Sequence, residues 1–190
     1  MKFLYMKQKA LSAEACDALI SVFEASTDLQ APGETAQGYD PEHKSDTEIR
    51  IEPQLFVRPE WALPLAPVFP ALQTAVDEYK TRTVGLNLIS PWALSAPFNM
   101  QRYLPGEGYR ALHCEVDAGT NAGLSRVLTW ILYLNTITDQ GGTFFPNQDT
   151  TVTAEQGKLL ISPAYWTHSH QGIVSPTQTK YILTGWYQFC

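Results

Sequence analysis

Hydrophobic and polar residues follow two different periods along this chain of 190 residues. In the segment 11–26, apolar side chains from Cys16 to Phe23 recur with the spacing of one helical face. Ser12 stands just before this run, where its hydroxyl can accept a hydrogen bond from the first helical turn. The pattern predicts an amphipathic helix over residues 11–26.

The segments that follow this helix differ in character. Residues 27–48 are polar and contain glycines and prolines without periodicity, which predicts a loop and a candidate substrate lid. Residues 48–57 alternate briefly and predict a strand. A second helix is predicted between Pro59 and about Thr83, beginning near Pro70, because proline fits the first turn of a helix.

After Leu86 the pattern becomes that of a β-rich protein. Short runs rich in Val, Ile, Thr and aromatic residues alternate with turn residues, and the runs that predict strands are FNMQRYL, YRALHCEV, SRVLTWILYLN, TTVTAEQ, KLLISP and TKYILTGWYQF. Many short strands at this spacing are typical of a sandwich or barrel. The expected fold is α+β and mainly β, a single domain over 1–190 with a helical part at about 1–85 and a β core at about 86–190.

Composition and charge narrow the classes of function. Apolar residues make up 44% of the chain and charged residues 17%, which are ordinary values for a globular protein. A formal net charge of −6, without any run of Lys or Arg, argues against a nucleic-acid partner. No window approaches roughly 18 apolar residues, so no membrane span is expected. Three unpatterned cysteines and no signal-peptide pattern favour a reducing compartment, and a cytoplasmic location is therefore expected.

Three of the four histidines lie in two short segments, and these segments carry the candidate chemistry. In a strand, residues two apart point to the same face, so a strand through YRALHCEV would place His113 and Glu115 side by side. One further histidine would complete the ligand set that suits non-haem Fe(II) and leaves positions open for substrate and O2. His168 and His170 are both candidates for that third position.

The His-x-Glu pattern also has a structural interpretation. A histidine hydrogen-bonded in the core, next to a solvated carboxylate on an edge strand, would show the same spacing. The HEXXH pattern of zinc proteases and paired CxxC zinc ligands are both absent from the sequence. Spacing alone therefore leaves the metal site a hypothesis.

Five segments strengthen the metal hypothesis, because they occur in the order of a known family: YLPGEGYRALHCE, RVLTWILYLN, GGTFFP, VTAEQGKLLISP and HSHQGIVSPTQTKYILTGW. Together they resemble the prolyl 4-hydroxylase-like branch of the Fe(II)/2-oxoglutarate-dependent dioxygenases, over about residues 98–189. The leading segment LSAEACDALISVF also looks like the family's opening helix. The resemblance implies a double-stranded β-helix, or jelly-roll, core with N-terminal helices packed on one sheet.

The resemblance implies that His113 and Glu115 fill the first two iron positions. Most of the family has Asp where Glu115 stands, although the His-x-Glu form is similar to a phage- and bacteria-associated subgroup. The longer Glu side chain leaves Asp117 as a rival ligand on the same predicted face. Glu115 is preferred because it keeps the family's spacing from His113. A retained carboxylate also separates this chain from the family's halogenases, which have a small residue at that position.

The position of Lys180 implies the third ligand. In this branch a basic residue follows the distal histidine at a nearly fixed interval, and Lys180 is ten residues after His170 but twelve after His168. We therefore take His170 as the ligand and place His168 behind the ligands or on the substrate side. Lys180 is implied to pair with the distal carboxylate of 2-oxoglutarate, since an unpaired ammonium in this apolar segment would be costly.

The resemblance and the local pattern also assign other side chains. Tyr133 is implied to donate its hydroxyl to the same carboxylate, and Tyr103 matches another cosubstrate-side tyrosine of the family. Residues 141–142, both glycine, predict a tight turn near the site. Trp166 and Trp186 are interpreted as core residues in preference to substrate contacts.

The expected protein is an Fe(II)- and 2-oxoglutarate-dependent hydroxylase that uses O2, releases succinate and CO2, and takes ascorbate as its reductant. The first hypothesis for the reaction is prolyl 4-hydroxylation of a peptide or protein, with the loop 27–48 as a clamp. The alternatives are hydroxylation of a free amino acid or another small molecule, and a non-catalytic jelly-roll binding module. The intact ligand set together with Lys180 disfavours the last of these.

Overall fold

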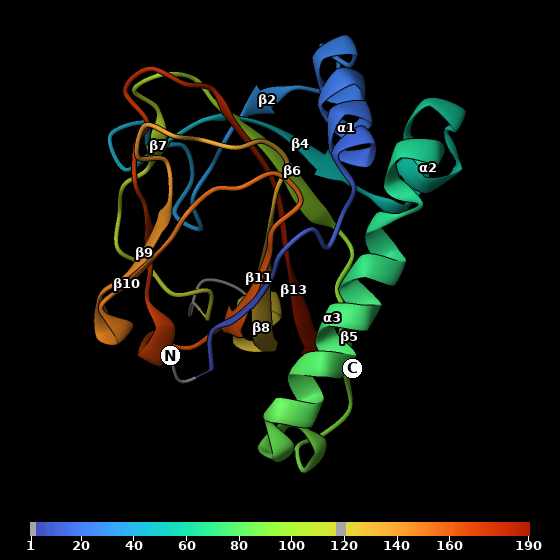
Figure 1. The fold of residues 1–190 in the computed structure, drawn as a ribbon, viewed down its shortest axis with the longest axis vertical. Coiled ribbons are helices and arrows are strands. Elements are labelled where there is room, and N and C mark those ends of the chain that lie inside the picture. The colour runs from blue at the N-terminus through green and yellow to red at the C-terminus, as the bar shows by residue number, and fades with distance from the viewer. Residues whose placement is uncertain (1–2, 117–120) are drawn as a thin grey trace.

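A computed structural model describes residues 3–116 and 121–190 and shows helices in the first half of the chain, followed mainly by antiparallel strands (Figure 1). The helices are α1 (Ala13–Ala25), α2 (Pro59–Leu65), α3 (Val68–Arg82) and α4 (Asn121–Leu124). The strands are β1 (Tyr5–Lys7), β2 (Ala31–Pro32), β3 (Lys44–Ser45), β4 (Thr47–Ile51), β5 (Trp92–Leu94), β6 (Phe98–Tyr103), β7 (Gly108–Tyr109), β8 (Arg126–Tyr133), β9 (Thr143–Phe145), β10 (Thr150–Val152), β11 (Leu159–Pro163), β12 (Gln171–Gly172) and β13 (Lys180–Phe189).

Most of the strands pair into one large sheet. Eight strands form it in the order β1-β11-β8-β13-β6-β4-β2, with β5 paired to β13. A smaller sheet has the order β10-β9-β12, and β3 pairs with β7. The pairings are antiparallel throughout. The fold is therefore α+β and mainly β, as the sequence predicts.

The helices α1, α2 and α3 lie along one side of the large sheet (Figure 1). Phe23 of α1 and Leu72 of α3 are buried in an apolar cluster with side chains from the sheet. The sheet contributes Met100, Trp130 and Leu183 from β6, β8 and β13. Removing these apolar surfaces from water holds the helices against the strands.

A second apolar cluster lies on the other face of the same sheet. Strand β8 contributes Ile131 and Tyr133 to this cluster, and the intervening Trp130 and Leu132 to the first. Alternate residues of a strand point to opposite faces, so β8 supports both clusters at once. Phe145 of β9 joins the second cluster, which therefore packs between the large and the small sheet.

The structure confirms the first predicted helix and moves the start of the second. α1 matches the prediction at 11–26, and the Ser12 side chain accepts a hydrogen bond from the Ala15 N–H at 3.2 Å, as an N-cap does. The second helical region begins earlier than predicted, because α2 starts at Pro59. Pro70 falls in the first turn of α3, where a missing N–H costs no hydrogen bond.

The strand predicted at 48–57 is right only in its first half. β4 ends at Ile51, and Pro53–Val57 form a 3-10 helix. Pro53 has no N–H for a strand ladder, so the pairing stops before it. The segment 27–48 is mostly irregular, as predicted, with only the short strands β2 and β3 and the start of β4 inside it.

Two further findings concern membrane crossing and the cysteines. Within the described part of the chain, no helix combines the length and the apolarity that crossing a bilayer requires. Cys16, Cys114 and Cys190 carry free thiols, and the Cys16 side chain of α1 is buried in the first apolar cluster.

Replacing Leu19 by Ala should lower the free energy of unfolding by about 2–5 kcal/mol, because its side chain is fully buried in the first apolar cluster and its loss leaves a cavity. Urea titration measures this change. Leu63 is the control: its side chain is 79% exposed, and Leu63→Ala should cost less than about 0.5 kcal/mol. Equal losses in the two variants would contradict the packing of α1.

Candidate metal centre and its cavity

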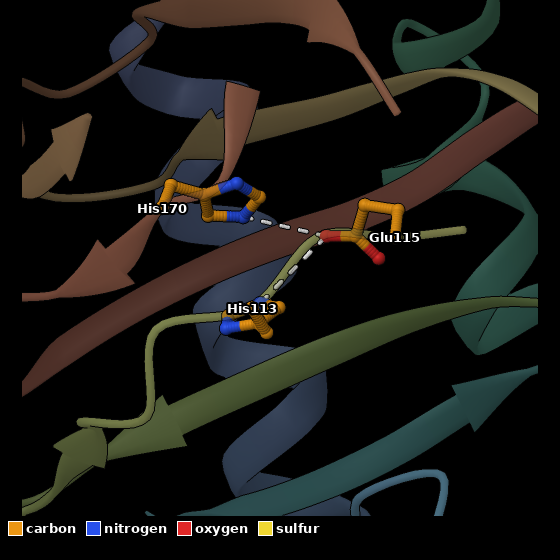
Figure 2. A group of neighbouring side chains, drawn as sticks. All are labelled: His113, Glu115 and His170. Carbon is orange, nitrogen blue, oxygen red and sulfur yellow. Dashed lines mark ion pairs between the residues drawn. The ribbon is translucent and has the colours of Figure 1, made fainter. Parts of the chain in front are cut away.

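Three side chains from two distant segments of the chain converge at one point (Figure 2). His113, Glu115 and His170 each offer one ligand atom, and these atoms all lie within 4.8 Å of one another. Glu115 Oε1 is 3.3 Å from His170 Nε2 and 3.9 Å from His113 Nε2. In residues 3–116 and 121–190, no other three His, Cys, Asp or Glu side chains converge in this way. The structure thus brings together the three residues that the resemblance selects as ligands.

A backbone bridge joins the two histidines. The His113 N–H donates to His170 O at 3.0 Å, and the His170 N–H donates to His113 O at 2.8 Å. The bridge is isolated, because β7 ends at Tyr109 and no regular strand continues through Glu115. The strand predicted from YRALHCEV is therefore wrong beyond Tyr109. Glu115 is fixed separately, through its N–H to Ala164 O at 2.9 Å.

Hydrogen bonds orient both imidazole rings toward Glu115. Nδ1 of His113 lies 2.8 Å from Ala111 O, and Nδ1 of His170 lies 3.1 Å from His168 O. In a neutral imidazole the Nδ1–H donates to that carbonyl, so Nε2 presents a lone pair toward the carboxylate. When both rings are neutral, these lone pairs and the anionic oxygen repel one another unless a cation, either a proton or a metal ion, lies between them. The donor set therefore fits a divalent metal ion, and nitrogen–nitrogen–carboxylate is the set that suits non-haem Fe(II).

The pKa values of Glu115 and His113 favour the protonation states of metal ligands. Burial by itself raises the pKa of Glu115, but the hydrogen bond and charge of His170, the charge of His113 and the hydrogen bond from Trp186 outweigh it and bring the pKa to about 2. Burial and the charge of His170 lower the pKa of His113 to about 4, against the opposing effect of Glu115. Near pH 7 Glu115 is therefore ionised and His113 is neutral, which are the protonation states that metal binding requires.

Two residues that sequence reasoning did not assign to the site hold Glu115. Trp186 Nε1 donates to Glu115 Oε2 at 2.7 Å, and Arg126 Nη1 donates to the Glu115 backbone oxygen at 2.7 Å. The interpretation of Trp186 as a core residue is wrong, because its ring is half-buried and lines the cavity described below. The two-residue period of a strand could have predicted this position. Trp186 is an even number of residues from Lys180 on β13, so both side chains lie on the same face of the strand.

Aromatic rings pack against both histidines. The Tyr109 ring stacks on that of His113, with centroids 3.8 Å apart and planes 10° apart, and the Phe145 ring lies 5.1 Å from that of His170. These contacts restrict rotation of the imidazoles. Trp166 is 73% exposed, so its interpretation as a core residue is also wrong.

Of the two alternative ligands, His168 lies within the described residues and Asp117 does not. His168 is buried, with Nδ1 3.0 Å from Thr167 Oγ1 and its ring 6.3 Å from that of Phe3. It does not belong to the converging group of the described residues. Asp117 lies outside the described residues, so its role as an alternative ligand stays a prediction.

The candidate ligands border a cavity of about 410 Å³. Alternate residues of the neighbouring strands β13 and β6 line it on one face of the large sheet, as the two-residue period of a strand requires. The residues on β13 are Lys180, Ile182, Thr184 and Trp186, and those on β6 are Asn99, Gln101 and Tyr103. Residues 34–37, from the predicted loop 27–48, also line the cavity.

Lys180 places a buried cation in this cavity. It is 5% exposed, its Nζ donates to Gly141 O at 3.1 Å, and Nζ lies 4.7 Å from the centre of the Tyr103 ring. Burial lowers the pKa of Lys180 to about 8, and the charge of Asp46 offsets part of this effect. Among the described residues, no carboxylate is close enough to form an ion pair with Lys180. A protonated ammonium in this position fits an anion from outside the protein.

Lys44 is a second buried lysine at the cavity, and it differs from Lys180 in having internal counter-ions. Its Nζ is 3.0 Å from Asp46 Oδ1 and 3.0 Å from Glu48 Oε2. The positive charge of Lys44 is thus balanced within the protein. Of the two buried lysines at the cavity, Lys180 is therefore the candidate for pairing with an anion from outside the protein.

The two candidate cosubstrate tyrosines occupy different places. Tyr103 lines the cavity and donates its hydroxyl to Gln101 Oε1 at 2.8 Å. The Tyr133 hydroxyl lies 2.7 Å from Thr143 Oγ1, and it is Thr143 rather than Tyr133 that lines the cavity. Sequence reasoning missed Thr143, which carries a hydroxyl at the position where the hydroxyl of Tyr133 was expected.

Gly141 lies in the predicted turn and holds Lys180 through its carbonyl oxygen. Its φ is +71°, in the region that favours glycine. A Cβ at this position would come 2.4 Å from Ile137 Cγ2. The turn next to the site therefore depends on glycine for both backbone conformation and space.

Comparisons with known proteins agree with this geometry. Residues 98–188 match the family model described as the 2OG-Fe(II) oxygenase superfamily. No curated protein sequence matches the chain.

Solved structures with a similar fold include three prolyl hydroxylases. A viral collagen prolyl hydroxylase of Paramecium bursaria Chlorella virus 1, in a 2OG complex, is 18% identical, with a TM-score of 0.72 over 100% of this chain and 97% of that one. A Pseudomonas putida prolyl-4-hydroxylase is 18% identical, with a TM-score of 0.68 over 97% and 92%. A Trichoplax adhaerens prolyl hydroxylase, in complex with a peptide fragment of the hypoxia inducible factor oxygen degradation domain, is 16% identical, with a TM-score of 0.71 over 99% and 84%. At these identities the likeness shows the fold.

Replacing Lys180 by Met should stabilise the ligand-free protein by about 1–3 kcal/mol, because it removes a buried ammonium for which residues 3–116 and 121–190 provide no paired carboxylate. The pKa of about 8 lies below the ordinary 10.5, so the unfolded chain binds more protons between these values, and the destabilising effect of Lys180 disappears as pH rises. The advantage of Lys180→Met should thus be full at pH 7 and shrink toward pH 10.5, as measured by urea unfolding.

Lys44→Met is the matched control for this prediction. It should destabilise the protein, because it leaves Asp46 and Glu48 without their cation. A loss of stability in Lys180→Met at pH 7 would contradict the charge balance assigned to the cavity.

Proposed function

The chain belongs, through residues 98–188, to the 2OG-Fe(II) oxygenase superfamily and is an oxidoreductase, and from that premise we propose that it hydroxylates prolyl residues of a peptide or protein. One observation carries the proposal: a single cavity joins the His/Glu/His group to a buried lysine that pairs with no carboxylate of the described residues. The proposal assigns Fe(II) to His113, Glu115 and His170, and the distal carboxylate of 2-oxoglutarate to Lys180.

The protein's own contribution at the metal is a set of ligands oriented and correctly ionised before the metal arrives. Backbone carbonyls fix the imidazoles so that Nε2 faces the carboxylate, and Glu115 supplies the negative charge. Three protein ligands leave the remaining coordination positions for cosubstrate and O2. When bound, the iron would couple O2 activation and decarboxylation of 2-oxoglutarate, to succinate and CO2, with hydroxylation of the substrate.

In this proposal, the cosubstrate is held by side chains that line the same cavity as the candidate metal ligands. The Lys180 ammonium would pair with the distal carboxylate and so recover the cost of its own burial. Tyr103 and Thr143 line the same space, and Tyr133 would act on the anion through its hydrogen bond to Thr143. A cavity of about 410 Å³ lies within the range of small-molecule sites.

We interpret the large sheet and the β10-β9-β12 sheet as the two halves of a double-stranded β-helix. The apolar cluster packed between the two sheets supports this interpretation. Such a core would hold ligands from distant segments at one rigid end.

Two observations support a peptide substrate. The similar structures include enzymes named for collagen and for a peptide fragment of hypoxia inducible factor. In addition, residues 34–37 line the cavity, where the loop 27–48 could contact an extended chain as a clamp.

The second candidate substrate is a free amino acid or a similar small polar molecule. Charged side chains of both signs line the cavity, among them Glu34, Glu48, Arg50 and Arg126, and these could receive an amino group and a carboxylate. The non-catalytic binding module is the least supported alternative, because binding alone would not require the complete His/Glu/His group in the same cavity as Lys180.

The purified protein with Fe(II), ascorbate, O2 and 2-oxoglutarate should form succinate, including slow turnover without a prime substrate. His170→Ala should abolish succinate formation, because it removes one of three metal ligands. His43→Ala is the control and should retain it, since His43 is exposed and paired with Asp40. His168→Ala separates the two ligand candidates and should also retain turnover. No succinate above the His170→Ala level would refute the catalytic proposal.

Peptides that contain proline should gain the mass of one oxygen atom when they are added to the same reaction. Mass spectrometry of a peptide panel, set beside a panel of free amino acids, distinguishes the two candidate substrates. Oxygen incorporation into free amino acids alone would transfer the proposal to the small-molecule alternative. Oxygen incorporation into neither panel, with succinate still formed, would contradict both.

A further inference from the structure

The two carboxylate oxygens of Glu115 have different surroundings (Figure 2). Oε1 faces His170 Nε2 at 3.3 Å and His113 Nε2 at 3.9 Å. Oε2 accepts the indole N–H of Trp186 at 2.7 Å and lies 3.7 Å from Arg126 Nη1. One oxygen is thus directed to the candidate metal position, and the other is engaged by side chains of the cavity wall.

Trp186 and Arg126 also hold each other. The Arg126 guanidinium lies 3.8 Å from the centre of the Trp186 ring, within the range of a cation–π contact. The two residues come from the neighbouring strands β13 and β8, whose register places Trp186 opposite Thr129. Arg126 also donates to the backbone oxygen of Glu115 at 2.7 Å. The main chain and the carboxylate of Glu115 are therefore both anchored to the same pair of side chains.

The anchoring matters because Glu115 has one methylene more than the Asp that most of the family has at this position. Compared with Asp, a glutamate has one more rotatable bond, so its carboxylate has more orientations to lose when it binds a metal. It can also turn both oxygens to the metal and occupy a position that the cosubstrate or O2 needs. The hydrogen bond from Trp186 to Oε2 restricts the orientation of the carboxylate and keeps Oε2 from turning to the metal. Oε1 alone therefore faces the histidines.

We propose that Trp186 and Arg126 form a clamp that presents Glu115 to the metal through Oε1 only, and so allow a glutamate to serve as the acidic ligand of this site. Both are positioning residues, since they act through Glu115. The inference rests on the proposed function, because it concerns metal ligation by Glu115. Hydrogen bonds behind a metal ligand orient it and raise the affinity of the site for its metal.

The test is the affinity of the metal-free protein for Mn(II), measured by isothermal titration calorimetry. Trp186→Phe removes the indole N–H and keeps an aromatic ring for Arg126. It should weaken Mn(II) binding about tenfold, the lower end of the effect of removing such a partner. Circular dichroism and the melting temperature confirm that the variant is folded.

Trp92→Phe is the matched control. The indole N–H of Trp92 also donates to an oxygen, Leu86 O at 3.4 Å, and a cation, Lys80 Nζ, also lies 4.5 Å from its ring centre. Its variant should bind Mn(II) as the wild type does. His113→Ala shows whether the wild type binds Mn(II) at the proposed site. If the wild type binds more tightly than His113→Ala, equal Mn(II) affinities of Trp186→Phe and Trp92→Phe would overturn the clamp but not the metal site. A wild type no better than His113→Ala would overturn both proposals.

A double-mutant cycle with Glu115→Asp separates the clamp from a merely structural role of Trp186. An aspartate is one methylene shorter, so its carboxylate does not reach the indole and the histidines together. In the Glu115→Asp background, Trp186→Phe should therefore change Mn(II) affinity by less than about twofold. The same tenfold loss in both backgrounds would show that Trp186 acts without Glu115 and would overturn the proposal.

Discussion

The mutual backbone hydrogen bonds between His113 and His170 join two segments that otherwise belong to separate loops. Each bond satisfies a backbone group that would be costly to bury unpaired. Residues directly opposed in an antiparallel pair have neighbouring side chains, and here the two imidazole centroids lie 4.6 Å apart. Glu115 follows His113 closely and is fixed by Ala164, so its carboxylate meets both rings. The metal centre thus depends on a pairing of only two residues.

The buried charges of the cavity differ in their partners. Glu115 is stabilised as an anion by its neighbours, and Lys44 has Asp46 and Glu48 as internal counter-ions. Lys180 contacts a carbonyl and an aromatic ring and forms no ion pair with a carboxylate of the described residues, and burial lowers its pKa. A group that costs stability in the free protein is typical of a site whose partner arrives from outside. In the proposed function, the protein would thus lose some stability in order to bind the carboxylate of its cosubstrate.

Local patterns in the sequence were sufficient for the helix α1 with its Ser12 cap and for the β-rich C-terminal half, because periodicity and capping depend on neighbours along the chain. The family resemblance, rather than spacing, selected His170 over His168 as the candidate ligand. The structure places His170 in the converging group and leaves His168 outside it. Residue types and intervals thus identified the chemistry before any geometry was known.

By itself, then, the sequence determined the α+β class and the β-rich second half, since these depend on local patterns, and its family resemblance selected the candidate ligands. Only the tertiary structure decided that an isolated bridge replaces the strand expected around His113, that Trp186 and Arg126 hold Glu115, and that Thr143 stands at the cavity in front of Tyr133. These contacts depend on the register between strands far apart in the chain. Sequence spacing within one segment carries no information about that register, because it is set by packing of both sheet faces together.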